Sequence, residues 1–279
     1  MSGSPQLRID SGPSIDWIVF DRPDASNAFS LALLEAFSDA LASLATTGAP
    51  VIGIRGAGKG FSSGLDLSEY NAGGTPVEDV ARLRRNLDRW QEMWRHPKPV
   101  IVAIHGYCIG IAAQMPCFAD MTIVAENARI GEPGIPIGGG YIAPAWVSQV
   151  GAKRAKELAF LPGNHVDGKT AVEWGWANAA VPAGHLIACV EALADRMAKI
   201  PLPVLTMKKR SINRAMEAGG FLTAVNAVSD RYAILHFEPA VLELRESLAT
   251  NGLRKTLASF QGESSTEIFQ HFKGDKANG

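Results

Sequence analysis

The sequence predicts an α/β core followed by an all-helical C-terminal section. Apolar, β-branched runs typical of buried strands alternate with helical patterns up to about residue 182, and only helical patterns follow. The 279 residues are 47% hydrophobic and 20% charged, which is ordinary for a globular protein with a sizeable core. We place the division between the core, residues 1–200, and the helical section, residues 201–279, at Pro201-Leu202-Pro203.

The elements of the core follow from local patterns. Ser30 is a suitable N-cap for the first helix, which should end before Gly48. A later helix should begin near Gly110 and be shortened or kinked by Pro116, which lacks a backbone N–H. In chain order we expect strands at 15–20, 51–55, 100–104, 121–125 and 179–181, and helices at 30–47, 80–95, 110–115, 153–161, 167–175 and 186–200.

The C-terminal section shows helical patterns from residue 204 to about residue 259, with no convincing strand. Residues 263–279 are polar, and we expect them to be frayed.

Composition excludes several functional classes. The net charge of −1 argues against a nucleic-acid surface, and no apolar run approaches the roughly 18 residues of a membrane span. The first residues carry no basic stretch followed by an apolar one, so no secretory signal is expected. Cys108, Cys117 and Cys189 form no CxxC pair. We therefore expect a cytoplasmic protein with reduced thiols and no bound metal.

The stretch from Pro97 to Gly140 is the most informative part of the chain. A buried strand delivers Gly110 to the start of a helix, where backbone N–H groups lack partners. Such groups suit a developing oxyanion.

Three motifs surround this stretch in a defined order. They read Arg22-Pro23 with Asn27-Ala28, Phe61-Ser62-Ser63-Gly64-Leu65-Asp66-Leu67, and Lys98-Pro99-Val100-Ile101 with His105-Gly106-Tyr107 and Cys117-x-x-Asp120.

Together the motifs resemble the enoyl-CoA hydratase/isomerase (crotonase) superfamily, and the resemblance covers residues 10 to about 260. It implies a spiral of ββα turns, a helical C-terminal section that makes trimer contacts, and a homotrimer or dimer of trimers. It also implies an acyl-CoA thioester as substrate, with no cofactor besides the CoA of the substrate. The residues that it places against the substrate are Ser62, Ser63, Gly64, Leu65, Asp66, Gly110, Ile111 and Gly134.

In this resemblance the backbone N–H groups of Ser63 and Ile111 stabilise a thioester enolate. Hydratases of the family also use two glutamates, and the matching positions here hold Gln114 and Gly134. A carboxamide cannot exchange a proton at neutral pH, and glycine offers no side chain. The chain is therefore an atypical member that has lost both usual proton-transfer groups.

Other side chains could replace those groups. Glu132 could supply a carboxylate, although a surface or ion-paired role is favoured, and Tyr141 could contact substrate or only pack. Asp66 could act as an acid, but holding its loop is the better interpretation. Trp90 and Trp94 could pack in the core or over an acyl group. Lys208-Lys209-Arg210 should form a solvated face, with a CoA phosphate contact as the alternative.

The leading interpretation is an acyl-CoA enzyme of the lyase or isomerase class, with Ser63, Ile111, Gln114, Glu132 and Tyr141 as candidate catalytic residues. Its reaction stays open among hydration, isomerisation, decarboxylation and hydrolysis. The alternatives are a non-catalytic acyl-CoA-binding protein and an oligomer scaffold.

Overall fold

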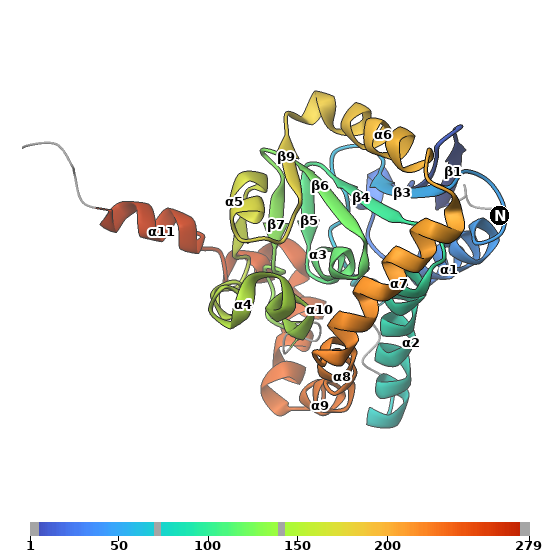
Figure 1. Cartoon of the computed structure of the whole chain (residues 1–279). Helices are drawn as coiled ribbons and strands as arrows, with labels where there is room; N and C mark the ends of the chain where they lie inside the picture. The colour runs from blue at the N-terminus through green and yellow to red at the C-terminus, as the bar shows by residue number, and fades with distance from the viewer. Residues whose placement is uncertain (1–5, 70–73, 139–142, 274–279) are drawn as a thin grey trace, which may run out of the picture.

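A computed structural model describes residues 6–69, 74–138 and 143–273 of the chain (Figure 1). Its strands form a six-stranded sheet in the order β1-β2-β3-β4-β6-β9 and a three-stranded sheet in the order β5-β7-β8. The strands are β1 (Leu7–Ser11), β2 (Ile15–Phe20), β3 (Val51–Gly56), β4 (Val100–Ile104), β5 (Tyr107–Ile109), β6 (Met121–Ala125), β7 (Arg129–Gly131), β8 (His165–Val166) and β9 (Ala179–Val181).

The large sheet is parallel except for the antiparallel pair β1–β2. Its register aligns Ile18 with Ile54 and Ile54 with Val102. Every residue of β2 and β4 is buried, as expected of strands that are covered on both faces. This burial explains why their sequences are continuous apolar runs rather than alternating ones.

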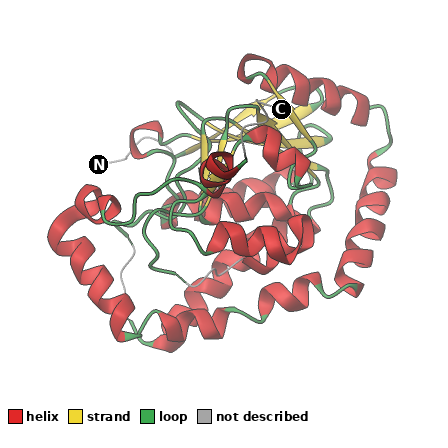
Figure 2. Cartoon of the chain, turned by 90° about the vertical axis from the view of Figure 1, so that its left-hand side faces the viewer, coloured by secondary structure: helices red, strands yellow, loops and turns green. Residues whose placement is uncertain are grey.

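Helices cover both faces of this sheet. On one face, Ile18 and Phe20 of β2 pack with buried side chains of α1 and α2. On the other face, Trp17 and Val19 pack with α6. Figure 2 shows the strands grouped together, with helices along much of the outline of the molecule. The helices of the core are α1 (Leu31–Leu44), α2 (Pro76–Arg95), α3 (Ile111–Gln114), α4 (Ala143–Ala159), α5 (Gly168–Glu173) and α6 (Leu186–Met197).

Several predicted helix boundaries are confirmed by their caps. The Ser30 hydroxyl accepts the Leu33 N–H at 3.1 Å, and the Asp167 carboxylate accepts the Thr170 N–H at 2.8 Å. Helix α3 is a single turn, and Pro116 lies in the 3₁₀ turn η2 (Met115–Phe118) that follows it. Helix α4 begins ten residues before the predicted 153–161, and Gly151, with φ 76°, interrupts it.

The C-terminal section is helical, as predicted. It consists of α7 (Leu202–Ala218), α8 (Phe221–Asn226), α9 (Ser229–Leu235), α10 (Pro239–Ala258) and α11 (Ser265–Phe272). The predicted frayed end is wrong for α11, whose capping box pairs Ser264 with Glu267 and which projects from the body in Figure 1. The predicted solvated face is wrong for Lys209, which is buried and donates to Asp120 Oδ2 at 2.8 Å. That ion pair fastens α7 to the end of the loop before β6. No helix in the described ranges is long and apolar enough to cross a membrane.

Candidate active site

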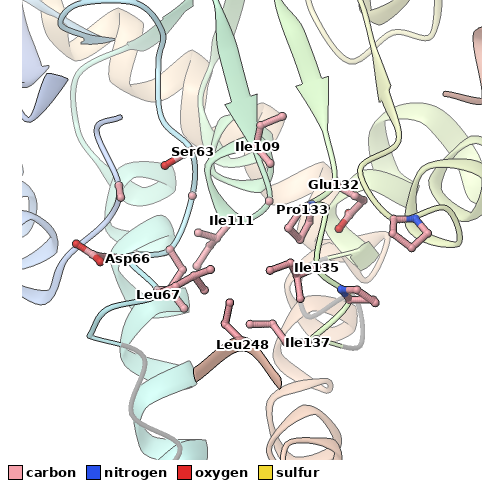
Figure 3. Close-up of a pocket in the computed structure, with 18 of the residues that line it drawn as sticks. Ser63, Asp66, Leu67, Ile109, Ile111, Glu132, Pro133, Ile135, Ile137 and Leu248 are labelled. Atoms are coloured by element: carbon pink, nitrogen blue, oxygen red, sulfur yellow. The ribbon is translucent and has the colours of Figure 1, made fainter. Parts of the chain in front are cut away.

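A cavity of about 890 Å³ opens between the core and the C-terminal helices. Its walls come from the glycine-rich loop after β3, the start of α3, the segment after β7, and helices α2, α9 and α10. Figure 3 shows Ser63, Asp66 and Leu67 on one side of this space, Glu132 and Pro133 on the other, and Ile111 between them. The cavity thus gathers residues that lie far apart in the sequence.

The glycine-rich loop is fixed by buried hydrogen bonds. The Ser62 hydroxyl donates to the Asn27 carbonyl oxygen at 2.7 Å and accepts the Gly64 N–H at 3.1 Å. Gly64 has φ +90°, and a Cβ there would lie 2.6 Å from the Ile109 carbonyl oxygen. Only glycine fits this position, so the loop can pass close to the strand before α3.

Backbone pairing corrects one predicted oxyanion donor. The Ser63 N–H already donates to the Ser26 carbonyl oxygen at 3.0 Å. Leu65 is paired differently, because Phe29 forms a parallel bridge with it. The Phe29 N–H donates to the Gly64 carbonyl oxygen at 2.7 Å, and the Phe29 carbonyl oxygen accepts the Asp66 N–H at 3.2 Å. In such a parallel bridge the N–H of the central residue points away from the partner strand. Leu65 lines the cavity, and its N–H has no protein acceptor in the described part of the chain.

Ile111 supplies a second N–H beside Leu65. Gly110, with φ 62°, donates its own N–H to the Gly131 oxygen at 2.8 Å and turns the chain into α3. Ile111 is the first residue of this helix, so its N–H has no intrahelical acceptor. A Cβ on Gly64 would lie 3.7 Å from Ile111 N, which places the loop and the helix start side by side. The sequence prediction of Ile111 as a cavity-lining residue agrees with this geometry.

Glu132 brings a carboxyl group into the cavity. Its backbone N–H donates to the Asn164 oxygen at 2.9 Å, which fixes the segment after β7. Its side chain lines the cavity and has no hydrogen bond or ion pair within residues 6–69, 74–138 and 143–273. Removal from bulk water raises the pKa of Glu132 to about 7. The expected surface or ion-paired role of this residue is therefore wrong.

The two positions that matched the family's glutamates also lie at the cavity. Gln114 is 5% exposed and lines the cavity. Its side chain makes no hydrogen bond within the described residues. A Cβ on Gly134 would lie 2.7 Å from Leu257 Cδ2, so α10 fills the space that a side chain would occupy there. Neither position can exchange a proton.

Asp66 holds the loop, as the sequence favoured. Its carboxylate accepts from Arg22 Nη1 at 3.0 Å and from the Ser68 hydroxyl at 2.6 Å. Burial raises the pKa of Asp66, but the Ser68 and Arg22 contacts outweigh it and the net pKa is lowered. Asp66 therefore remains an anion at neutral pH and is poorly suited to donate a proton.

Other site predictions have different outcomes. Tyr141 lies outside the described residues. Trp90 and Trp94 lie in the hydrophobic core and not at the cavity wall. The wall that α2, α9 and α10 form has no signal in the sequence, since only the tertiary fold brings these helices over the loop. Polar and apolar members of this wall are Arg82, Asn86, Tyr232, His236, Leu248, Leu253 and Leu257.

Comparisons with known proteins agree with this arrangement. The profile of the family Enoyl-CoA hydratase/isomerase matches residues 10–231. The hydroxycinnamoyl-CoA hydratase-lyase of Pseudomonas fluorescens is 27% identical over 219 residues, which cover 76% of this chain and 79% of that protein. The 2,3-dehydroadipyl-CoA hydratase of Escherichia coli K12 is 27% identical over 206 residues, which cover 72% of this chain and 78% of that protein.

Solved structures show the same similarity. A candidate enoyl-CoA hydratase/isomerase from Novosphingobium aromaticivorans is 59% identical, with a TM-score of 0.94 over 96% of this chain and 100% of that one. An enoyl-CoA hydratase/isomerase from Xanthobacter autotrophicus Py2 is 28% identical, with a TM-score of 0.87, and the match covers 92% of this chain and 97% of that one. These matches confirm the crotonase-type fold that the sequence predicts, and the chain belongs to the enoyl-CoA hydratase/isomerase family.

Proposed function

We propose that the protein binds an acyl-CoA thioester in this cavity and moves a proton on its acyl group through an enolate. The observation that carries the proposal is the placement of three groups in one cavity, namely the N–H groups of Leu65 and Ile111 and the carboxyl of Glu132, none of which has a hydrogen-bond partner among the described residues. The thioester oxygen accepts from both N–H groups. They stabilise the negative charge that develops on it when the α-carbon loses a proton.

Glu132 is the proton-transfer group in this scheme. A base is most effective when its pKa lies near the working pH, and the pKa of about 7 meets this condition. Glu132 takes a proton from one carbon of the acyl group, the electron pair moves into the enolate, and the same proton returns to another carbon. The double bond shifts and no other reactant is consumed. This is an isomerisation.

Hydration is less well supported by the site. Adding water across a double bond requires one group to activate the water and another to protonate carbon, and Gln114 and Gly134 do neither. The same substitutions favour a second candidate, an acyl-CoA-binding protein without catalysis.

Proton exchange in D₂O distinguishes these functions. The wild type should exchange the α-protons of 3-enoyl-CoA thioesters and the γ-protons of 2-enoyl-CoA thioesters, and interconvert the two isomers. Glu132→Gln should bind the same thioesters with similar affinity and exchange them about 10²- to 10⁴-fold more slowly. Binding without any exchange would support the binding protein, and the absence of both binding and exchange would refute the proposal.

We also propose that the chain assembles as a homotrimer or a dimer of trimers in the cytoplasm. Exposed apolar side chains support the assembly, among them Ile212 of α7, 64% exposed, and Phe272 of α11, 83% exposed. Light scattering coupled to gel filtration tests it, and a monomer at micromolar concentration would contradict it. Fractionation of cells that express the native protein tests the location.

A further inference from the structure

Asn86 is a polar residue in the helical wall of the cavity, on α2. It is 5% exposed and lines the cavity with Leu83 of the same helix. Its side-chain oxygen Oδ1 accepts from Arg89 Nη1 at 2.8 Å, one turn further along. A guanidinium can only donate, so this bond fixes which end of the amide is oxygen and which is nitrogen. The amide nitrogen Nδ2 is therefore the end that remains available.

Asn86 Nδ2 has two N–H donors and no acceptor among the residues that the structure describes. Asn86 Nδ2 has no partner among these residues but is not fully enclosed by protein atoms, so part of its surface faces space that a ligand or water can occupy. Because Asn86 lines the cavity and is otherwise buried, we infer that this space is the cavity. A donor held in this way is satisfied when a ligand presents an oxygen acceptor to it.

Arg89 places a positive charge next to the Asn86 amide. Its side chain is 8% exposed and takes part in none of the ion pairs found in the described residues. Burial lowers the pKa of Arg89, while the carboxylates of Glu35 and Glu92 raise it from a distance. An arginine stays protonated at neutral pH, so the charge persists behind the Asn86 amide. An anionic oxygen gains most from such a donor.

The neighbouring wall is apolar. Leu83, Leu248, Leu253 and Leu257 line the same cavity. These side chains suit a hydrocarbon stem, and Asn86 offers a hydrogen-bond donor to the same cavity. A hydrocarbon end placed against Asn86 would leave the amide nitrogen without a partner and without water.

We propose that the acyl group of the substrate carries an oxygen acceptor, preferably a carboxylate, that binds Asn86 Nδ2. This inference rests on the proposed function of the same cavity and names its substrate class. Asn86 then selects the substrate, while Leu65, Ile111 and Glu132 act on the thioester end.

The test compares CoA thioesters of equal chain length that end in a methyl group, a hydroxyl group or a carboxylate, over several lengths. With the wild type, kcat/KM should be about 10- to 100-fold higher for the best carboxylate substrate than for its methyl analogue, with the hydroxyl substrate between them. Asn86→Leu should bring this ratio to about one or below. Asn86→Asp keeps an acceptor for Arg89 but removes the donor, so it should also abolish the carboxylate preference.

The matched control is Asn213→Leu. Asn213 lies on α7, does not line the cavity, and donates to the Trp94 oxygen at 2.9 Å, so its loss should lower stability and leave the substrate ratio unchanged. A wild type that prefers the methyl substrates, or an Asn86→Leu ratio equal to that of the wild type, would overturn the inference.

Calorimetry with the corresponding saturated acyl-CoA thioesters separates this inference from the proposed function. Tighter binding of the carboxylate thioester without turnover of any enoyl-CoA would uphold the role of Asn86 and refute the proposed catalysis. Turnover without a substrate preference would uphold the proposed catalysis and refute the role of Asn86. Binding of none of the thioesters would refute both.

Discussion

In the proposed mechanism, proton transfer in the cavity depends on Glu132. Because its pKa is about 7, the fraction that is ionised and able to act as a base grows as the pH rises through neutrality. The wild-type kcat/KM for isomerisation should therefore rise with a midpoint near pH 7. Glu132→Gln should remove this rise of kcat/KM with pH and lower kcat about 10²- to 10⁴-fold. A pH profile of both proteins checks this, and an unchanged rise in the variant would assign the titration to another group.

The same carboxyl should affect stability. Its pKa rises from 4.5 to about 7 on folding, so between these values the folded chain keeps a proton that the unfolded chain has lost. The contribution of Glu132 to the free energy of unfolding therefore decreases as the pH rises from 4.5 to 7. At pH 8, Glu132→Gln should be more stable than the wild type by on the order of 3 kcal/mol. At pH 4 the two should unfold at nearly the same urea concentration.

At the residue scale, Gly64, Asp66 and Ile111 line the cavity, as the family resemblance implied. Their motifs are visible in the sequence because short turns and helix starts are encoded locally. Among the described residues the loop N–H without an acceptor is that of Leu65 rather than Ser63, since pairing with distant Phe29 and Ser26 decides which N–H is left over. Local patterns do not contain that information.

At the scale of elements, the loop around Gly64 and the start of α3 must stay in contact. Gly64→Ala would place a Cβ 2.6 Å from the Ile109 oxygen at φ +90°. The loop would have to move away from Ile111, so the two N–H donors would separate. We expect kcat to fall about 10²- to 10³-fold, the cost of losing one donor, with a smaller change in KM. Steady-state kinetics test this, and Gly262→Ala, where a Cβ meets nothing within 4 Å, is the control.

The buried pair of Lys209 and Asp120 joins α7 to the core. Lys209→Ala would leave the Asp120 carboxylate buried without its cation, and we expect a loss of about 3–5 kcal/mol in the free energy of unfolding. Lys209→Met with Asp120→Leu removes both charges and should lose less. Denaturant titrations of the three proteins measure the difference. Equal losses would show that packing, and not the unpaired charge, governs this contact.

Elements with strong local signals were predicted, and the strands of the small sheet were not. Strands β2, β3, β4 and β6 are apolar runs, and α1 and α5 begin at recognisable caps. Strands β5, β7 and β8 have only two or three residues each, and they exist because they pair with one another in the folded chain. The polar composition of residues 263–279 predicts a frayed end, yet Ser264 and Glu267 form the capping box that starts helix α11.

At the scale of the whole molecule, the C-terminal helices form one wall of the site. Helix α10 places Leu257 Cδ2 2.7 Å from the position of a Cβ on Gly134, so a glutamate there requires the Leu257 side chain to move. Gln114→Glu with Gly134→Glu should hydrate 2-enoyl-CoA thioesters weakly or not at all. Adding Leu257→Ala frees space for the new carboxylate and should raise the hydration rate about tenfold or more. Absorbance of the enoyl thioester reports this rate, and equal rates in both variants would show that α10 does not limit the site.

The fold class and the helical C-terminal section follow from sequence because strand and helix periodicities differ over long segments. The placement of the C-terminal helices over the site does not, since it depends on contacts such as that between Trp94 and Glu217, which lie 123 residues apart. For this reason Asn86 and Leu257 had no sequence signal as site residues.

A crystal structure with a slowly reacting acyl-CoA thioester tests the central claim most directly. The thioester oxygen should lie about 3 Å from both Leu65 N and Ile111 N, with the Glu132 carboxyl within hydrogen-bonding reach of the α-carbon proton. A thioester oxygen bound elsewhere, or a Glu132 side chain turned away from the acyl group, would contradict it.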